Sequence, residues 1–205
     1  MRAGEARRRR ARELPRREAR PLAMARARLV VLDRDGVINE DSREFVKSVA
    51  EWRPLPGSLE AIAALTRAGY RVAVVTNQSG VGRGLFSEAT LGLIHSRMSA
   101  AVRDAGGELA GVYYCPHHPD AGCDCRKPKT ALLRRLERDL GVSLEGVPFV
   151  GDRMSDVGAA DAVGARAMLV RTGTGAATAR SLGARSIEVF DDLAAAARAI
   201  LAERA

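Results

Sequence analysis

The stretch Leu29-Val-Val-Leu-Asp33-Arg34-Asp35-Gly36 decides the fold class. Leu29–Leu32 is a short apolar run that predicts a buried strand, and two aspartates and a glycine follow it at once. In a continuing strand the two carboxylates would point to the same face. Such a pair favours a cation between its members, and Mg²⁺ prefers carboxylate oxygens. An ordinary Asp-Gly turn after a strand explains these residues equally well, so alone they leave both interpretations open.

Downstream of this stretch, short β-rich runs alternate with helical patterns. We predict helices at 58–68, 87–104 with Ser87 as its N-cap, 130–140, 155–162, and a last one capped by Asp191 and ending near Leu201. Strands are predicted at 71–75, 111–114, 147–150, 167–170 and, more weakly, 187–190. This alternation predicts an α/β fold with a doubly wound, mostly parallel sheet and helices on both faces. Ligands of such sheets bind beyond the carboxyl ends of the strands.

Polar groups follow three more of the predicted strands. The second strand ends in Thr76-Asn77-Gln78-Ser79, a neutral set that can bind phosphate oxygens without repelling a nucleophile. The loop after the third leads to Arg126-Lys127, whose fixed charges can stabilise a phosphoryl group. The fourth ends in Gly151-Asp152-Arg153, which brings a third carboxylate to the same edge. Each segment has an ordinary alternative: a polar turn, a basic helix start, or a helix cap at Ser155 or Asp156.

The four strand ends together resemble the motifs of the haloacid dehalogenase superfamily of phosphotransferases, in order, from Leu29 to Phe190. The resemblance implies that Asp33 is the nucleophile, forming an aspartyl phosphate, and that Asp35 is the general acid and base. It implies that Thr76 and Lys127 hold the phosphoryl group. Mg²⁺ is then bound by the Asp33 carboxylate, the Asp35 main-chain carbonyl and Asp152.

All three cysteines lie between Cys115 and Cys125, in a loop rich in Pro, His, Asp and Gly. Cys115, His117, Cys123 and Cys125 have the spacing of a tetrahedral Cys₃His zinc site with no open position, which is typical of structural zinc. Cysteines that merely pack in a core are the alternative, but this loop could not form a core. Spacing favours His117 over His118 without excluding His118. Cysteine usage of this kind predicts a cytoplasmic protein.

A narrower resemblance rests on DRDGVIN, TNQSGVGRG, YYCPHHPDAGCDCRKP and GDRMSD, starting at Asp33, Thr76, Tyr113 and Gly151. Together these segments resemble the D-glycero-D-manno-heptose-1,7-bisphosphate 7-phosphatases, zinc-loop members without a large cap domain. The resemblance implies that Arg126, supported by Arg153, contacts the second phosphate of a sugar bisphosphate, and that Asn77 and Ser79 position the sugar. Arg153 stands where the family often has Lys, and contacts in the region 41–44 are the least defined.

Other functions compatible with these motifs are a histidinol-phosphate phosphatase of the same architecture, a nucleic-acid 3′-phosphatase and a non-catalytic zinc module. The net charge of +8 would ordinarily suggest nucleic acid. However, residues 1–28 hold 11 arginines and 3 glutamates, which is +8, and the remaining 22 basic and 22 acidic residues balance. We therefore predict a phosphatase domain at 29–205 that binds a small sugar phosphate, neither nucleic acid nor membrane, as a monomer.

Residues 1–28 are predicted to be an Arg-rich, disordered tail, because they show a run of charge and no apolar periodicity. Three interpretations of this tail are open. It is an arm for RNA or an anionic membrane, a solvated extension, or a segment that precedes a natural start at Met24.

Overall fold

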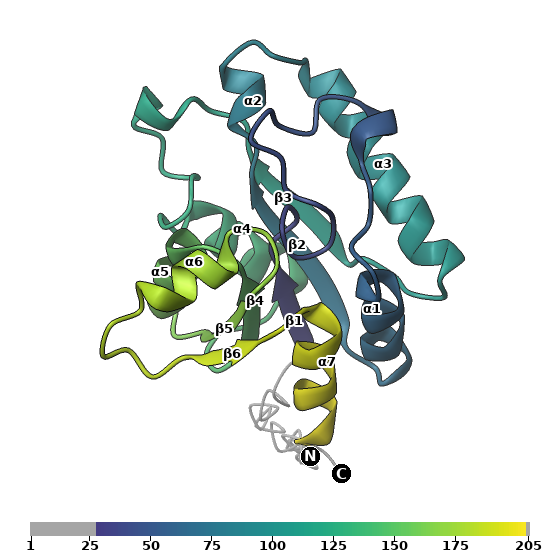
Figure 1. The fold of residues 1–205 in the computed structure, drawn as a ribbon, viewed down its shortest axis with the longest axis vertical. Coiled ribbons are helices and arrows are strands. Elements are labelled where there is room, and N and C mark those ends of the chain that lie inside the picture. The colour runs from purple at the N-terminus through teal and green to yellow at the C-terminus, as the bar shows by residue number, and fades with distance from the viewer. Residues whose placement is uncertain (1–27, 204–205) are drawn as a thin grey trace, which may run out of the picture.

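The computed structural model describes residues 28–203 and contains one six-stranded parallel sheet, in the order β3-β2-β1-β4-β5-β6 (Figure 1). Its strands are β1 (Leu29–Leu32), β2 (Arg71–Asn77), β3 (Gly111–Cys115), β4 (Pro148–Gly151), β5 (Arg166–Val170) and β6 (Glu188–Phe190). The predicted doubly wound sheet is therefore confirmed. The predicted tail lies outside the described residues, except Arg28. Its backbone oxygen accepts a hydrogen bond from Arg71 N at 2.6 Å, so this residue belongs to the folded domain.

The helices connect the strands on both faces of the sheet. They are α1 (Ser58–Arg67), α2 (Ser79–Gly82), α3 (Glu88–Asp104), α4 (Ala131–Leu140), α5 (Met154–Asp161), α6 (Gly175–Arg180) and α7 (Leu193–Ala202), with 3₁₀ turns η1 (Val49–Glu51) and η2 (Pro119–Ala121). Within residues 28–203, no helix combines the length and apolar character needed to cross a bilayer.

Two of the helix caps considered in the sequence are found in the structure, and two are not. Ser87 Oγ accepts a hydrogen bond from Thr90 N at 3.0 Å, which confirms the predicted start of α3. The predicted cap of α7 is wrong, because Asp192 and not Asp191 is the N-cap, with its Oδ1 2.7 Å from Ala195 N. Two adjacent aspartates offer the same capping chemistry, and only the path of the chain selects between them. Of the two caps considered for α5, Ser155 lies inside the helix, which begins at Met154, whereas Asp156 does cap it, because its Oδ2 accepts a hydrogen bond from N of the N-cap residue Arg153 at 3.0 Å.

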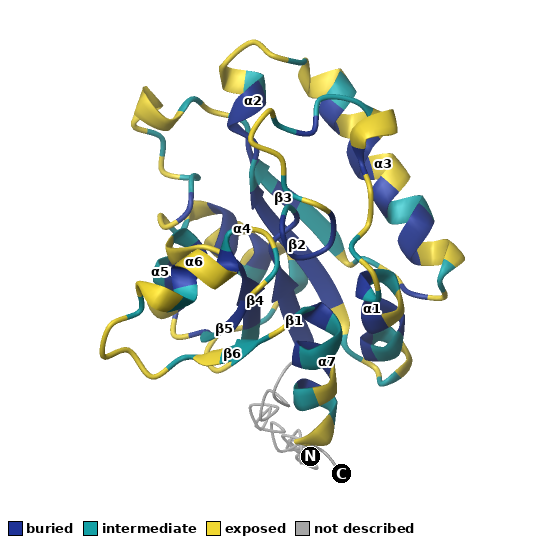
Figure 2. Ribbon diagram, viewed as in Figure 1, coloured by how far each residue is buried: buried dark blue, intermediate teal, exposed yellow. Residues whose placement is uncertain are grey.

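Strand β1 divides the core into two layers because alternate side chains point to opposite faces of the sheet. Val30 and Leu32 join one apolar cluster, whose helical side chains come from α1, α3 and α7. Leu29 and Val31 join the other, with side chains of α4 and α5. All four residues of β1 are buried, and Figure 2 shows the buried sheet between exposed outer helix faces. The strand that carries the first motif is thus held rigidly from both sides.

The strand order reverses its direction between β1 and β4, which are paired through Val31–Phe149 and Leu32–Val150. At such a switch point the connections leave in opposite directions and open a crevice beyond the carboxyl ends of the strands. Asp33 follows β1 and Asp152 follows β4, so the fold places both carboxylates in this crevice.

Candidate active site

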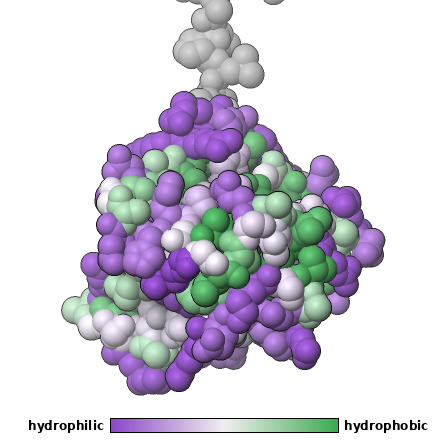
Figure 3. Space-filling model, turned by 90° about the horizontal axis from the view of Figure 1, so that it is seen from above, coloured by the Kyte–Doolittle hydropathy of each residue, from purple (hydrophilic) through white to green (hydrophobic). Residues whose placement is uncertain are grey.

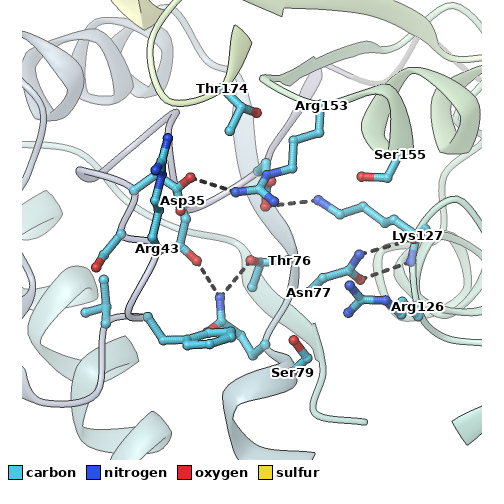
Figure 4. Close-up of a pocket in the computed structure, with 16 residues that line it drawn as sticks. Asp35, Arg43, Thr76, Asn77, Ser79, Arg126, Lys127, Arg153, Ser155 and Thr174 are labelled. Carbon is cyan, nitrogen blue, oxygen red and sulfur yellow. Dashed lines mark hydrogen bonds and ion pairs between the residues drawn. The ribbon is translucent and has the colours of Figure 1, made fainter. Parts of the chain in front are cut away.

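A pocket of about 410 Å³ opens at the carboxyl ends of the central strands. The predicted catalytic residues Asp33, Asp35, Thr76 and Lys127 all line it, as do the predicted substrate-binding residues. In Figure 4 Arg43 stands on one side of the pocket, and Arg126 and Lys127 on the other. The end of the molecule seen from above in Figure 3 is largely hydrophilic, with some apolar side chains gathered near its middle. The pocket therefore suits a polar, anionic ligand.

Lys127 is the buried cation at the base of this pocket. Its Nζ lies 2.9 Å from Asp33 Oδ1 and 2.7 Å from Asp156 Oδ1, and donates to the carbonyl of Val75 at 2.6 Å. Burial acts to lower the pKa of Lys127, but the two carboxylates outweigh it and the pKa lies above its ordinary value. Lys127 therefore stays charged beside the predicted nucleophile.

Three carboxylates, Asp33, Asp152 and Asp156, each place an oxygen within 4.8 Å of the others. Burial raises the pKa of Asp33 to about 7; Lys127 opposes that shift, and Asp156 and Asp152 add to it. Burial likewise raises the pKa of Asp152 to about 6. Such a cluster has more negative charge than Lys127 alone neutralises, so it fits a hard divalent cation.

The surroundings of Asp152 support the same interpretation. Thr174 N and Oγ1 bind Asp152 Oδ2 at 2.7 and 2.9 Å, whereas Oδ1 accepts no hydrogen bond from any residue in 28–203. A Cβ atom on Gly36 or Gly173 would lie 2.6 or 2.4 Å from Asp152 Oδ2, so both positions accept only glycine. Oδ2 is thus fixed by Thr174, whereas Oδ1 has the Arg153 guanidinium as an ion-pair partner, with Nε 3.6 Å away, and is open to a ligand such as Mg²⁺.

The structure assigns Asp156 a position that the sequence did not. Its Oδ2 accepts hydrogen bonds from the backbone N–H groups of Asp152 and Arg153 at 3.2 and 3.0 Å, and its Oδ1 pairs with Lys127. We therefore interpret Asp156 as the residue that orients Lys127 and the turn after β4. Asp33 and Asp152 stay the predicted ligands of a cation, although Asp33 Oδ1 also pairs with Lys127, at 2.9 Å.

Several hydrogen-bond donors hold the carboxylate of Asp35 in place. Its carboxylate accepts hydrogen bonds from Arg34 at 2.9–3.0 Å, from Asn39 Nδ2 at 2.8 Å and from Gln78 Nε2 at 2.7 Å. Burial acts to raise the pKa of Asp35, but the Arg34 charge and these hydrogen bonds outweigh it and the pKa lies below its ordinary value. In this state Asp35 is an ionised carboxylate at the rim of the pocket.

Gln78 and Asn77, at the end of β2, hold different residues of the pocket. Gln78 Nε2 joins Thr76 Oγ1, 3.0 Å away, to Asp35. The Asn77 side chain donates to Lys127 O at 3.2 Å and accepts from Lys127 N at 3.0 Å. Asn77, predicted to position the sugar, is therefore engaged in holding Lys127, while Ser79 lines the pocket at the start of α2.

Three arginines surround the outer part of the pocket. Arg153 Nη2 lies 2.6 Å from Asp41 Oδ2, which ties the 41–46 segment to the turn after β4. Arg126 Nη1 is buried and has no hydrogen-bond partner among residues 28–203. Arg43 lines the pocket, and its side chain is exposed. Among these three arginines, Arg126 is thus the one with a buried N–H group, on Nη1, that is available to a ligand.

The four predicted zinc ligands meet at the end of β3. Cys115 Sγ lies 3.6 Å from both Cys123 Sγ and His117 Nδ1, and His117 Nδ1 lies 3.1 Å from Cys125 Sγ. The side chain of His118 instead accepts a hydrogen bond from Asp120 N at 3.3 Å. The structure thus brings His117, and not His118, into the cluster. Neutral imidazole and thiolate sulfur are ligands that suit zinc.

Three pocket-supporting residues were missed in the sequence: Arg34, Asn39 and Thr174. Gln78 was expected to bind phosphate oxygens and Asp156 to cap a helix, but Gln78 holds Asp35 and Asp156 also pairs with Lys127. Thr174 had no signal, because it lies in a loop after β5, and only the parallel pairing of β4 with β5 brings that loop beside Asp152. Arg34 lay inside the first motif, yet a charged residue there is ordinarily expected to face solvent.

The fold and the site define a phosphatase of the haloacid dehalogenase class, in which an aspartate after the central strand faces a buried lysine. A HAD-hydrolase-like family model matches residues 124–196, which include the Lys127 and Asp152 segments. Among curated proteins, a D-glycero-β-D-manno-heptose-1,7-bisphosphate 7-phosphatase of Pseudomonas putida is 51% identical over 173 residues. The match covers 84% of this chain and 99% of that protein.

Solved structures agree. The D,D-heptose 1,7-bisphosphate phosphatase of Bordetella bronchiseptica, complexed with magnesium and phosphate, matches with a TM-score of 0.83 and 49% identity, over 85% of this chain and 98% of that one. The enzyme of the same name from Burkholderia thailandensis matches with a TM-score of 0.67 and 41% identity, over 84% and 97%. The chain belongs to the D-glycero-β-D-manno-heptose-1,7-bisphosphate 7-phosphatase family.

Proposed function

We propose that this chain removes the 7-phosphate of D-glycero-β-D-manno-heptose 1,7-bisphosphate, with Mg²⁺, through an aspartyl phosphate on Asp33. The observation that carries the proposal is the Asp33 carboxylate itself, 2.9 Å from the buried Lys127 ammonium and beside Asp152. A carboxylate nucleophile splits a difficult hydrolysis into two easier displacements. The bound magnesium of the Bordetella bronchiseptica relative supports the choice of metal.

In the first step an Asp33 oxygen attacks phosphorus and the bond from phosphorus to the sugar oxygen breaks. Asp35, protonated for this step, gives its proton to the leaving oxygen, so that a neutral hydroxyl departs. Lys127 and Thr76 hold the equatorial phosphoryl oxygens, where charge is spread in the transition state. The Asp33 and Asp152 carboxylates and the Asp35 carbonyl would hold Mg²⁺, which would supply positive charge next to the phosphoryl group.

In the second step a water molecule attacks the phosphorus of the aspartyl phosphate. The Asp35 carboxylate takes a proton from this water, the Asp33 carboxylate leaves, and inorganic phosphate is released. Asp35 is then protonated again and ready for the next cycle. The grip of Arg34, Asn39 and Gln78 suits the ionised form of Asp35 that this second step requires.

Two phosphates on one sugar need two anion sites. The reacting phosphate occupies the base of the pocket, and the free Nη1 of Arg126 offers a charge-assisted hydrogen bond to the other one. Arg153, which also lines the pocket and is paired with Asp41, supports this second site, and Ser79 contacts the sugar. Remote binding of this kind orients the reacting group and raises kcat/KM.

The test compares kcat/KM for heptose 1,7-bisphosphate, a heptose monophosphate and histidinol phosphate on one preparation. We expect the bisphosphate to exceed the monophosphate by roughly ten- to hundredfold, which corresponds to a charge-assisted contact of about 1.5–3 kcal/mol. Arg126→Ala should erase most of this difference, whereas Arg97→Ala, on the exposed face of α3, should leave it unchanged.

Asp33→Asn should abolish turnover of every substrate. If histidinol phosphate is the best substrate, the heptose assignment is wrong and the phosphatase chemistry stands.

We also propose that Cys115, His117, Cys123 and Cys125 bind one structural zinc ion. Because Cys125 directly precedes Arg126 and Lys127, zinc would fix the loop that delivers both cations. The three cysteines form no disulfide. Free cysteines that can bind zinc are typical of a reducing compartment, which supports a cytoplasmic location.

A further inference from the structure

The carboxylate of Asp35 is held by a side chain that is itself buried to an unusual degree. Arg34 has no exposed surface, although it carries a full positive charge. Its Nε and Nη2 bind both oxygens of Asp35 at 2.9–3.0 Å. A guanidinium fork of this kind fixes the direction of a carboxylate as well as its charge.

The remaining nitrogen of Arg34 reaches across to a helix that carries no residue of the proposed reaction. Arg34 Nη1 lies 3.2 Å from Nε2 of His95, which is buried on α3. Arginine can only donate, so Nε2 of His95 must accept, and the ring is neutral with its proton on Nδ1. Burial, followed by the charge of Arg34, lowers the pKa of His95 to about 3, in agreement with a neutral ring.

The ring of His95 is fixed in turn by its neighbours. Its centroid lies 5.4 Å from that of Tyr114, at an interplanar angle of 59°. Tyr114 belongs to β3 and pairs in register with Thr76 on β2. The contacts therefore run from the sheet through His95 and Arg34 to Asp35, and Gln78 closes the path between Asp35 and Thr76.

We infer that His95 is a positioning residue for Asp35: by accepting the hydrogen bond of Arg34 Nη1, it fixes the guanidinium that aims the Asp35 carboxylate. The inference rests on the proposed function, in which Asp35 moves the proton at the leaving oxygen. Without an acceptor at this place, Nη1 is a buried donor without a partner, and Arg34 must turn toward another one. The Asp35 carboxylate then loses its two-pronged partner and keeps only Asn39 and Gln78, so its direction is less well fixed, while the contact of Asp33 with Lys127 is unchanged.

The test uses two substrates that differ in their need for the proton. A sugar phosphate releases a poor leaving group that must be protonated, whereas p-nitrophenyl phosphate releases a stable anion that need not be. The value of kcat/KM reports the first transfer, to Asp33, for both substrates. His95→Asn removes the acceptor, because its amide oxygen reaches only as far as Nδ1. His95→Gln extends an amide oxygen to about the place of Nε2 and serves as the rescue.

We expect His95→Asn to lower kcat/KM for the sugar phosphate by about tenfold or more, a part of the roughly 10²–10⁴-fold that proton transfer supplies. The value for p-nitrophenyl phosphate should change by about twofold at most, and His95→Gln should restore most of the loss. In the background of Asp35→Asn, the same His95 change should have no further selective effect, because its route to the reaction is gone.

The control is Ile94→Val, a neighbour on α3 whose apolar side chain is fully buried in the first core cluster and cannot accept a hydrogen bond. It should lower stability without changing the ratio between the two substrates. Equal losses on both substrates in His95→Asn, or an additive loss with Asp35→Asn, would overturn the inference and make His95 a purely structural residue. A wild-type chain that hydrolyses neither substrate would instead refute the proposed function itself.

Discussion

Asp33 takes its proposed reactivity from neighbours that come from different parts of the chain. Lys127 and Asp152 follow other strands, and Gly36 and Gly173 leave room for Asp152 by having no side chain. The sequence could predict Asp33, Asp152 and Lys127, because each lies directly after a strand or just before a helix. It could not predict Gly173, since glycines in loops are common and only the packed structure shows what a Cβ atom would meet.

Gly173→Ala should weaken magnesium binding. Gly173 has a φ of +58°, and its Cβ would lie 2.4 Å from Asp152 Oδ2 and 2.6 Å from the Cα of Gly36. Asp152 must therefore turn, and the Mg²⁺ concentration for half-maximal activity should rise roughly ten- to hundredfold, as for other changes behind a metal ligand.

The matched control is Gly183→Ala. Gly183 has a similar φ of +61°, but its Cβ would meet nothing within 4 Å. It carries the same backbone strain and should leave the Mg²⁺ dependence unchanged. Titrations of activity against Mg²⁺ that coincide for Gly173→Ala and the wild type would contradict this account of the site.

Stability should depend on pH through the same carboxylates. The pKa of Asp33 is raised from 3.8 to about 7, and that of Asp152 from 3.8 to about 6. Between pH 3.8 and about 7, the folded protein without Mg²⁺ therefore binds more protons than the unfolded chain. Their contribution to stability is complete below about pH 4 and is lost as the pH rises to about 7. The pKa of Asp35 is lowered from 3.8 and that of Lys127 is raised from 10.5, so these two groups affect stability only below and above this pH range.

Thermal unfolding at several pH values, with and without Mg²⁺, measures this effect. The increase in Tm caused by Mg²⁺ should be small near pH 5 and should grow toward pH 8, because the metal replaces the protons. In Asp33→Asn the growth should be reduced. An increase in Tm that is independent of pH would show that these carboxylates do not bind the ion.

At the scale of single elements, the loop between β3 and α4 combines a cysteine cluster with two cations of the pocket. Its composition allowed the four predicted ligands to be chosen, because Pro, Asp and Gly cannot by themselves make a core. In the structure Cys115 is nevertheless buried in the apolar cluster that α4 and α5 cover, and Cys123 and Cys125 pack against that cluster. The choice between His117 and His118 needed the backbone, which turns His118 toward Asp120 and His117 toward Cys125.

His117→Ala should therefore lose zinc, and His118→Ala should keep it. Elemental analysis after mild chelation, which removes the exchangeable Mg²⁺, should find about one zinc per chain in the wild type and in His118→Ala. His117→Ala should also unfold at a lower temperature and have a lower kcat/KM, because Arg126 and Lys127 follow Cys125 directly. Equal zinc in both variants, or none in the wild type, would refute the site.

The regular elements were predictable where apolar periodicity was strong, as in α1 and α4. The short helices α2 and α6 were not predicted, because four and six residues with several glycines and small side chains give no periodic pattern. Both follow strands at the pocket end of the sheet and are held by that position. Local propensity therefore explains the scaffold better than it explains the turns that line the site.

At the scale of the whole molecule, all motifs and the described fold lie within residues 28–203, and all of the excess charge except that of Arg28 lies before them. A chain that begins at Met24 should have the same kcat and KM on a small sugar phosphate as the full chain, and the same Tm. Steady-state kinetics and thermal unfolding of the two chains test this. A large fall in kcat or Tm on truncation would show that the segment belongs to the enzyme.

The monomeric state stays a prediction, for which a solution mass is the measurement.

The pairing of β4 with β1, and the contact of Thr174 with Asp152, have a consequence for the time course of protein synthesis. The ribosome makes Asp33 early, whereas Asp152 and Thr174, which holds it, are added only when about three quarters and about five sixths of the chain have been made. On the proposed function, a nascent chain therefore carries Asp33 through most of translation without its partner at the site. Chains from messages that end before residue 174 should then be inactive.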